Sequence, residues 1–563
     1  MPHVVIQSCC SDGSCVLACP VNCIHPAPGE PGFAEAEMLY VDANYCVDCG
    51  ACTTACPADA IVPHTTLTPA QQPFLALNAE YYQVFPHADR TPLALVPPQR
   101  RLLNEGPFRV AVVGAGPAGM YAADELLTHP EITVDVYDRL PTPYGLVRFG
   151  VAPDHPHTKQ VQKLFKEIER QPGFRYFLGV EVGKDILHAE LAAHYHAVIY
   201  TVGAAADRPL AVPGEDLVGS LSATDFVAWY NGHPDKQDLF IPLDTVASGR
   251  VVVVGNGNVA LDVARLLTED VAHLESTDIA TLPLERLRRS SVREVVVLGR
   301  RGPAEAAFTV PELVGLAGHD DINVVVDTGG VPITGEDTKS RLLRDLAEKP
   351  FDPAKRTIVL RFLASPIRVL GDERVTGVEV SRNRLEVDEN GTTRAVATGE
   401  TEVIEAGIVL RAVGYKGLPV ADLPYDAARG VVPNENGRVS RGVYVSGWVK
   451  RGPNGFIGTN KTDSEQTVEQ VLDDLDKGDY AEPAGNAATI AAMVRRRQPE
   501  VVDLAGWQAI EREERRRGQD SGRPRVKIVD VEEMRRIARE QRTGALYSPT
   551  RLVRNVSRLR VRA

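Results

Sequence analysis

The chain has 563 residues, of which 44% are hydrophobic and 24% charged, and its formal net charge is −13. This length is too great for one hydrophobic core and predicts about three domains. The composition is that of a globular protein, and no apolar run reaches the roughly 20 residues that cross a bilayer, which excludes a membrane-spanning helix.

Cysteines and charges are distributed unevenly along the chain. All nine cysteines lie between Cys9 and Cys56. This excludes a disulfide framework over the whole chain and a flavin-side redox disulfide like that of thioredoxin or glutathione reductases. Residues 1–89 contain nine acidic residues and no Lys or Arg, so most of the net charge belongs to this segment. The first residues lack the basic and long apolar regions of a secretory signal, and we expect a cytoplasmic protein.

Four cysteines, Cys46, Cys49, Cys52 and Cys56, have the spacing C-x2-C-x2-C-x3-C and are followed by Pro57. This is the iron–sulfur run of bacterial ferredoxins, in which three thiolates hold one cluster and the fourth holds the other. A zinc site would need two separated pairs of ligands instead.

A degenerate copy of this run comes earlier in the chain. Cys15 and Cys19 have the spacing of the last two ligands, Cys9 lies where the first ligand belongs, and Asp12 takes the second position. The sequence therefore predicts two clusters in an acidic segment that resembles a two-cluster bacterial ferredoxin, with an α+β fold over residues 1–65.

Exchange of the fourth ligands defines two ligand sets. One set is Cys19, Cys46, Cys49 and Cys52; the other is Cys9, Cys15 and Cys56, with Asp12 as an optional fourth ligand. Because a hard oxygen ligand holds iron less firmly than a thiolate, we expect one [4Fe–4S] cluster and a second that is either [4Fe–4S] or [3Fe–4S]. Cys10 is an alternative to Cys9, and Cys23 is expected near a cluster without binding it.

Residues 66–105 contain several prolines and aromatic residues and are predicted to be an extended linker with one short helix. After it, Val110–Val113 has the apolar character of a buried parallel strand. Gly114, Gly116 and Gly119 then have the GxGxxG spacing that lets a pyrophosphate approach a helix N-terminus. The next predicted strand ends at Asp138, where a ribose-binding acid is expected. The segment predicts a dinucleotide-binding fold.

A second unit of the same kind begins at Arg250. Gly255, Gly257 and Ala260 occupy the glycine positions, and the next predicted strand, Glu294–Leu298, is followed by Arg300 and Arg301 instead of an acid. Two arginines at this position suit a 2′-phosphate, so the second nucleotide is predicted to be NADP(H). Two such folds in one chain predict a flavoprotein that takes a hydride from a nicotinamide nucleotide.

Four ordered motifs carry a resemblance to a known family: PTPYGLVRFGVAPDHP, GNGNVALDVAR, GRRGPAEAAFTVPEL and GWVKRGPNGFIGTNK. Together they resemble the adrenodoxin reductase family of ferredoxin–NADP reductases, in the mycobacterial type with a fused N-terminal ferredoxin. The resemblance covers roughly residues 106–480, with further likeness at GRPRVK. It implies two Rossmann-like α/β domains, an FAD domain formed by residues 106–206 and 413–563 and an NADP domain of residues 207–412 inserted into it.

The resemblance also implies which residues bind the nucleotides. With the glycine loop, the FAD contacts would be Gly114, Gly116, Ala118, Gly119, Asp138, Leu146, Val182, Trp448, Gly455, Phe456 and Ile457. The NADP contacts would be Arg208, Asn256, Gly257, Asn258, Val259, Arg300, Arg301, Glu312 and Gly455. Asp154 and His155 are the titratable groups expected near the flavin ring. Hydride transfer needs no protein acid, so His155 either relays protons or holds structure through hydrogen bonds.

The leading hypothesis is an enzyme that passes electrons from NADPH to FAD, then to the clusters and a ferredoxin or similar one-electron acceptor, which could feed a cytochrome P450. One alternative is an electron-bridging subunit of a larger complex, like the small subunit of glutamate synthase. A second is a redox-sensing regulator that binds nucleic acid through its arginine-rich end. Two complete nucleotide sites argue against the regulator, and we expect neither a nucleic-acid partner nor a membrane span.

Overall fold

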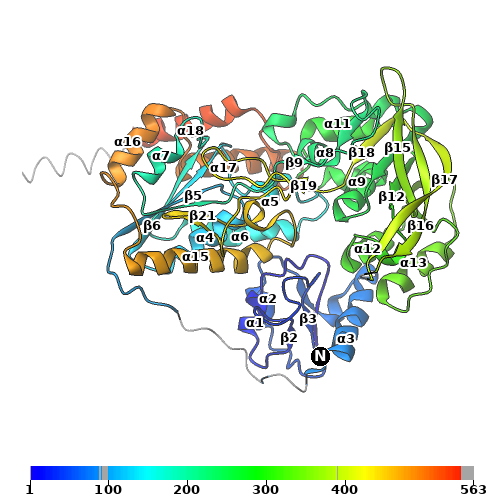
Figure 1. Ribbon diagram of the computed structural model, residues 1–563, viewed down its shortest axis with the longest axis horizontal. Helices are drawn as coiled ribbons and strands as arrows, with labels where there is room; N and C mark the ends of the chain where they lie inside the picture. The colour runs from blue at the N-terminus through cyan, green and yellow to red at the C-terminus, as the bar shows by residue number, and fades with distance from the viewer. Residues whose placement is uncertain (1, 88–90, 92–98, 390, 547–563) are drawn as a thin grey trace, which may run out of the picture.

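The computed structural model describes residues 2–87, 91, 99–389 and 391–546. We call residues 2–87 the head, residues 99–206 with 413–546 the first body, and residues 207–412 the second body. Figure 1 shows the head lying below the two bodies, beside helix α15 of the first and helix α12 of the second. Half of the predicted linker's six prolines and most of the arginine-rich end lie outside the described residues.

The head pairs its strands into two small antiparallel sheets, β1 with β4 and β2 with β3. Its elements are β1 (His3–Val5), α1 (Ser14–Ala18), β2 (Ile24–His25), β3 (Tyr40–Val41), α2 (Ala51–Ala55), β4 (Ile61–Pro63) and α3 (Pro73–Val84). Helix α3 packs on this unit although it lies beyond residue 65. Asn78 of α3 bonds to the backbone of Val5 and Val41, and Phe74 and Leu77 enter the head's core.

The first body has a six-stranded sheet in the order β20-β21-β8-β5-β6-β7, parallel except for β20. The strands are β5 (Phe108–Val113), β6 (Ile132–Asp138), β7 (Phe174–Leu178), β8 (Ala197–Tyr200), β20 (Arg438–Ser440) and β21 (Val443–Val445). The helices are α4 (Pro117–Leu127), α5 (Gly145–Phe149), α6 (Gln162–Glu169), α7 (His188–Ala192), α14 (Trp448–Arg451), α15 (Thr459–Lys477), α16 (Ala487–Arg497), α17 (Leu504–Asp520) and α18 (Val531–Leu546). Strand β21 ends at Val445, and Trp448 begins α14 three residues later.

The second body has a parallel six-stranded sheet in the order β10-β18-β11-β12-β14-β13 and an antiparallel sheet of β15, β16 and β17. The strands are β10 (Ser220–Ser222), β11 (Arg250–Val254), β12 (Glu294–Leu298), β13 (Ile322–Asp327), β14 (Arg356–Arg361), β15 (Ala364–Leu370), β16 (Gly377–Val387), β17 (Thr393–Glu405) and β18 (Ile408–Arg411). The helices are α8 (Ala223–Tyr230), α9 (Asn258–Thr268), α10 (Val271–Glu275), α11 (Thr281–Arg288), α12 (Val310–Ala317) and α13 (Thr338–Glu348). Two short strands, β9 (Ala206–Asp207) and β19 (Tyr415–Lys416), pair where the chain crosses between the bodies.

Each Rossmann-type sheet is buried because its strands are short apolar runs. Four successive residues from Val110 are buried in β5, and β11 and β12 each bury four of five residues. Parallel strands covered by helices on both faces have this character. The two glycine loops therefore emerge at the carboxyl ends of central strands, where such sheets bind nucleotides.

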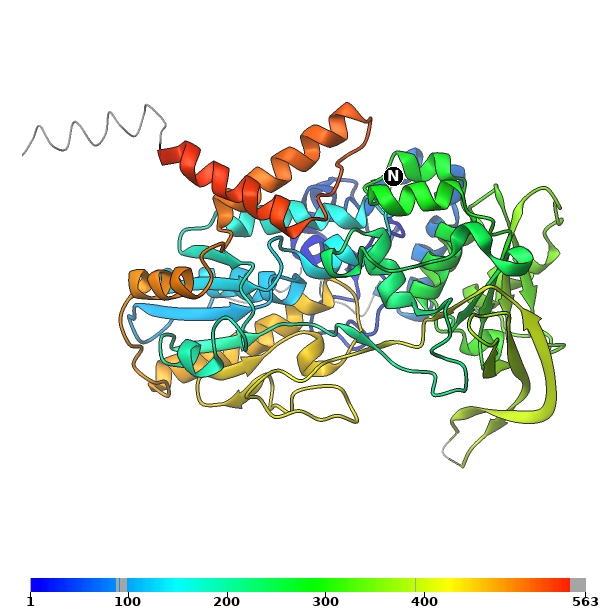
Figure 2. The same cartoon turned by 90° about the horizontal axis from the view of Figure 1, so that it is seen from above.

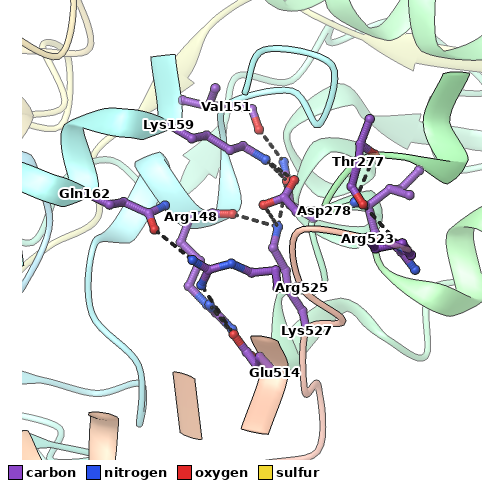
Figure 3. A network of polar contacts seen from close by, with 12 residues as sticks. Arg148, Val151, Lys159, Gln162, Thr277, Asp278, Glu514, Arg523, Arg525 and Lys527 are labelled. Atoms are coloured by element: carbon purple, nitrogen blue, oxygen red, sulfur yellow. Dashed lines mark hydrogen bonds and ion pairs between the residues drawn. The ribbon is translucent and has the colours of Figure 1, made fainter. Parts of the chain in front are cut away.

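A buried network of charges joins the bodies and the chain's C-terminal part (Figure 3). Asp278, between α10 and α11, accepts a hydrogen bond of 2.5 Å from Lys159 of the first body and pairs with Lys527 at 3.2 Å. Arg523 donates to the carbonyl oxygens of Thr277 and Ile279. The segment of residues 523–527 is thus anchored against both bodies.

Helices α17 and α18 pack against each other at one side of the first body, while the β16–β17 hairpin projects from the second body (Figure 2). Within the described part of the chain, none of the helices has the length and apolarity that a membrane crossing requires.

Candidate functional site

The head contains two halves with nearly the same local geometry. Gly13 and Gly50 precede α1 and α2 with φ of 74° and 73°, a left-handed conformation that glycine adopts without strain. Cys19 and Cys56 end the same helices with φ of −77° and −76°. The degenerate first run and the complete second run therefore fold alike, despite the different residue at Asp12.

The first predicted ligand set surrounds one cavity. Cys19, Cys46, Cys49 and Cys52 all line the same small pocket. Cys23 also lines it, with its Sγ 3.5 Å from Sγ of Cys19. Convergence of four thiols on one cavity fits a cubane cluster, whose irons each take one thiolate.

The second predicted ligand set lies in the other half of the head. Burial raises the pKa of Cys9 to about 11, and charges on Cys56 and Asp12 act on it in the same direction. Burial also raises the pKa of Cys15, and the charges of Cys9, Asp12 and Cys56 add to this effect. The four groups are therefore near neighbours. Asp12 already accepts a hydrogen bond of 2.5 Å from the Ser14 hydroxyl.

Cys10, which belongs to neither predicted ligand set, is buried beside the second set. It packs with Ala58 and Ala60, and Ile457 of the first body packs against the same cluster. Burial raises the pKa of its thiol well above the ordinary value. Cys10 therefore lies at the contact between the head and the first body.

The glycine loop after β5 forms a cradle at the N-terminus of α4. A Cβ on Gly114 would lie 2.6 Å from the Thr201 carbonyl oxygen, whereas one on Gly116 would meet nothing nearer than 3.9 Å. No side chain caps α4, so its first N–H groups are available to an anion. Asp138 accepts from the Ala115 N–H at 2.8 Å. This open, uncapped loop fits the pyrophosphate of a dinucleotide.

Segments remote in sequence meet at this loop. A Cβ on Gly447 would lie 2.7 Å from that of Ala118, and Gly145, the neighbour of the predicted contact Leu146, lies against Gly116. Trp448 follows directly and donates from its indole to the Asn454 carbonyl at 3.1 Å. The structure thus brings most of the predicted FAD residues together. Val182 lies further along the sheet edge, partly buried beside Phe177 and Val180.

One residue near the predicted FAD contacts was not predicted. Arg451 ends α14, and its Nε and Nη1 atoms are buried with no hydrogen-bond partner among the described residues. Its Nη2 donates to Asn460 at 3.2 Å. A buried guanidinium with unused donors suits an anionic group of a ligand. The signal for it in the sequence is the Lys-Arg pair in GWVKRGPNG.

The second glycine loop, after β11, has the corresponding form. Gly257 precedes α9 without a side-chain cap, and a Cβ there would meet nothing within 4 Å. The predicted contacts Asn256 and Val259 flank it. Asn258 is already engaged, because its Oδ1 accepts from the Thr309 N–H at 2.9 Å. The open glycine again leaves room for phosphate groups.

Arg300 and Arg301 directly follow Gly299 at the carboxyl end of β12. Arg300 is exposed, and neither guanidinium has an acidic partner among the residues that the structure describes. Arg208 is likewise exposed, and its N–H donates to the Gly414 carbonyl where the bodies meet. Unpaired arginines beside the glycine loop fit a nucleotide phosphate.

Asp154 and His155 belong to a largely buried cluster of charges that joins the bodies. Arg265 of α9 pairs with Asp154, contacts His155 and bonds to Asp262 at 2.7 Å. Nε2 of His155 is 3.3 Å from Asp262 and 3.5 Å from Glu312. The arrangement of His155, Asp262 and Glu312 resembles a cation site, but the Arg265 guanidinium already supplies the positive charge. Sequence reasoning missed Arg265 and Asp262, although they are three residues apart in the VALDVAR motif.

The charges of this cluster set its protonation. Burial opposes the charged form of Asp154, but Arg265 and His155 together hold the pKa of its carboxyl below the ordinary value. Burial and Arg265 would lower the pKa of His155, but Glu312, Asp262 and Asp154 outweigh them and raise it to about 9. An imidazolium held among carboxylates is suited to a fixed ionic contact more than to proton relay near neutral pH.

Glu312 also connects the second body to the head. Its Oε2 accepts from Gln7 Nε2 at 2.7 Å, and burial raises the pKa of its carboxyl. Glu37 of the head accepts from the N–H of Val310 at 2.7 Å. The N-terminal end of α12 is therefore covered by the head, beside a predicted NADP contact.

Two family models match the chain. One, described as pyridine nucleotide-disulphide oxidoreductase, matches residues 108–297. The other, described as 4Fe-4S binding domain, matches residues 39–62, which contain Cys46, Cys49, Cys52 and Cys56. The first match supports nucleotide binding by residues 108–297. That segment contains no cysteine, so it has no redox disulfide.

Several proteins are similar to this chain in sequence or structure, and those compared by sequence are named as reductases. A probable ferredoxin/ferredoxin--NADP reductase of Mycobacterium leprae is 48% identical, over 96% of this chain and 98% of its own. The mitochondrial NADPH:adrenodoxin oxidoreductase of Salvelinus fontinalis is 41% identical, over 77% of this chain and 91% of its own. A solved structure of Mycobacterium tuberculosis FprA in complex with NADPH is 43% identical and has a TM-score of 0.73, covering 77% of this chain and 99% of its own.

Proposed function

The chain belongs to the ferredoxin–NADP reductase family, and from this membership we propose that it oxidises NADPH and reduces a ferredoxin or a similar one-electron acceptor protein. One NADPH yields NADP⁺, a proton and two electrons, and two acceptor molecules take up one electron each. Bound FAD would accept the hydride and release the electrons singly. The observation that carries this function is the position of the head, whose second cysteine set lies against the first body beside the predicted FAD residues.

The proposed domains follow the two sheets. Residues 106–206 and 413–563 would form the FAD domain, and residues 207–412 the NADP domain inserted between them. In support, strands β10 to β18 of the second sheet lie in sequence between β8 and β20 of the first. Residues 1–65 would bind both clusters, with α3 as a support for this head and the linker after it.

In the proposed FAD site, each group has a separate task. Asp138 would bind ribose hydroxyls, and the N-terminus of α4 the pyrophosphate. Trp448, 5.1 Å from the ring of Tyr415, would shield the flavin from water together with Gly455, Phe456 and Ile457. In the NADP site, Arg300 and Arg301 would bind the 2′-phosphate. Asp154 and His155 would act through Arg265 by holding the two nucleotide domains in register.

We propose two clusters in the head. Cys19, Cys46, Cys49 and Cys52 would hold a [4Fe–4S] cluster, and Cys9, Cys15 and Cys56 a second one. We propose a [3Fe–4S] form of this second cluster, because its fourth position is occupied by Asp12, whose oxygen ligand holds iron less firmly than a thiolate. A cytochrome P450 served through a free ferredoxin is a suitable final acceptor.

Anaerobic spectroscopy tests this function. The protein would be purified with its cofactors, and visible and low-temperature EPR spectra recorded before and after addition of NADPH. We expect flavin bleaching followed by reduced-cluster signals, and an oxidised [3Fe–4S] signal before reduction. Bleaching of the flavin with clusters that respond to dithionite alone would contradict the proposed electron path and favour a bridging subunit that needs a partner. A silent spectrum before reduction would assign two [4Fe–4S] clusters.

A further inference from the structure

The body touches the head at the start of α15. Gly458, which precedes this helix, donates its N–H to the Cys10 carbonyl at 2.7 Å. One turn later, Lys461 donates to the Ser14 hydroxyl at 3.2 Å. Both ends of the Cys10–Ser14 segment are therefore fixed to the same short stretch of the first body.

Gly458 is needed at this contact for its small size. A Cβ there would come within 3.0 Å of the Asp12 backbone and of the Cys10 carbonyl oxygen, a separation that real Cβ atoms essentially never show. Its φ of −70° and ψ of −26° are ordinary helical values that any residue adopts. An alanine would therefore fit the backbone of the body but would push the head away.

The contact lies on one side of the head. Cys9, Cys56 and Ile457 of the first body all pack against the same small cluster of Cys10, Ala58 and Ala60. In the other set, Cys49 is exposed, as are the nearby Val47 and Tyr45, whereas Cys19 and Cys52 are buried. The two ligand sets thus differ in their access to the first body.

We propose that Gly458 is a positioning residue that sets the approach of the head to the body, so that electrons enter the head on its Cys9, Cys15 and Cys56 side and leave on its Cys19, Cys46, Cys49 and Cys52 side. This inference rests on the proposed function. Each electron that enters oxidises the reduced flavin by one electron and reduces the head by one, and an external acceptor protein takes it up at the exposed side.

The first test compares Gly458→Ala with wild type in the FAD- and cluster-loaded protein. Hydrogen–deuterium exchange should rise in the Cys9–Ser14 peptide, because the alanine separates it from α15. Reduction of the clusters by NADPH should slow by about tenfold or more relative to flavin bleaching, since small displacements of reacting groups are costly. Unchanged exchange and an unchanged rate ratio would overturn the proposal.

The matched control is Glu80→Gln, which weakens a contact between the head and the second body. Glu80 pairs with Arg341 of α13 at 2.5 Å. This variant should leave exchange in the Cys9–Ser14 peptide as in wild type. If Gly458→Ala fails to retain FAD, Lys461→Ala replaces it, because that change removes a contact without adding an atom; increased exchange at Cys9–Ser14 is then expected, and none would overturn the proposal.

The second test separates the two ligand sets. In Cys49→Ser, the remaining cluster signal should still appear with NADPH. In Cys15→Ser, the remaining cluster should respond to dithionite but respond to NADPH about tenfold more slowly or not at all, because the entry side is lost. If NADPH reduced the remaining cluster of Cys15→Ser at the normal rate but that of Cys49→Ser slowly, the inferred order would be overturned. If NADPH reduced neither cluster of the wild-type protein, the proposed function itself would be refuted.

Discussion

At the scale of single residues, we expect the arginines after β12 to decide which nicotinamide nucleotide the second glycine loop binds. Arg300 and Arg301 stand where an acid would bind a 2′-hydroxyl, and no described acid neutralises either one. A planar guanidinium can bind a phosphate through two parallel hydrogen bonds. We therefore expect a preference for NADPH over NADH to depend on these two side chains.

We expect the double variant Arg300→Ala, Arg301→Ala to raise KM for NADPH by about thirtyfold, the equivalent of about 2 kcal/mol for a lost charge-assisted contact. KM for NADH should change far less, because it lacks the 2′-phosphate. Steady-state kinetics with ferricyanide as acceptor measures both. Arg384→Ala, on the exposed β16–β17 hairpin, is the control. Equal losses with both nucleotides would contradict the assignment.

At the scale of elements, Glu169 joins three parts of the first body. It ends α6 and accepts hydrogen bonds from Tyr144, which precedes α5, at 2.7 Å and from Tyr176 of β7 at 3.0 Å. Burial raises the pKa of its carboxyl from 4.5 to about 7, against the opposing effect of the two phenols. The protonated form is therefore favoured in the folded protein.

This shift predicts a pH-dependent stability. Between pH 4.5 and about 7 the folded protein binds more protons at Glu169 than the unfolded chain, so this group's contribution to stability falls as pH rises through that window. Glu169→Gln cannot ionise but still accepts from both tyrosines. The melting temperature of the variant relative to wild type should therefore increase from pH 5 to pH 7.5, by the equivalent of about 3 kcal/mol at most.

The control for this prediction is Glu167→Gln on the exposed side of α6, where the glutamate pairs with Arg170 in solvent. Its difference from wild type should stay nearly constant over the same pH range. A Glu169→Gln difference that also stays constant, or that decreases with pH, would show that the glutamate is ionised throughout.

At the scale of the whole molecule, the C-terminal part holds the two bodies together through buried charges. Asp278 of the second body faces Lys159 of the first and Lys527 near the C-terminal end (Figure 3). Burial lowers the pKa of both lysines, and Asp278 opposes that effect. One carboxylate therefore compensates two buried ammonium groups contributed by different segments.

Asp278→Asn should destabilise the protein by about 3–5 kcal/mol, because it leaves these ammonium groups without a counter-charge. Thermal denaturation and proteolysis would measure the loss. Asp235→Asn is a matched control: Asp235 also joins the bodies, through Arg139 at 2.6 Å, but that pair is exposed and should contribute about 1 kcal/mol or less. Similar effects of both variants would contradict a special role for the buried network.

Much of the fold and of the candidate site could be predicted because its signals are local in sequence. The strand–glycine–helix units around Gly114 and Gly255 are specified by apolar runs and by turns that need glycine, within about 20 residues. The cysteine spacing predicts two ligand sets in the same way, since each run places its first three ligands around one cluster and its fourth at the other. The arginines after β12 required only the position of a strand end.

Contacts between remote segments could not be predicted. Gln7 and Glu312 are 305 residues apart, and the Gly458–Cys10 bond joins the head to a loop near the other end of the chain. Arg265 appeared as one more helical residue until folding placed it against Asp154 and His155. The sequence by itself determined the cofactor-binding units and their likeness to a family. Only the tertiary structure decided which face of the head meets the body, because that depends on the packing of surfaces that no local pattern records.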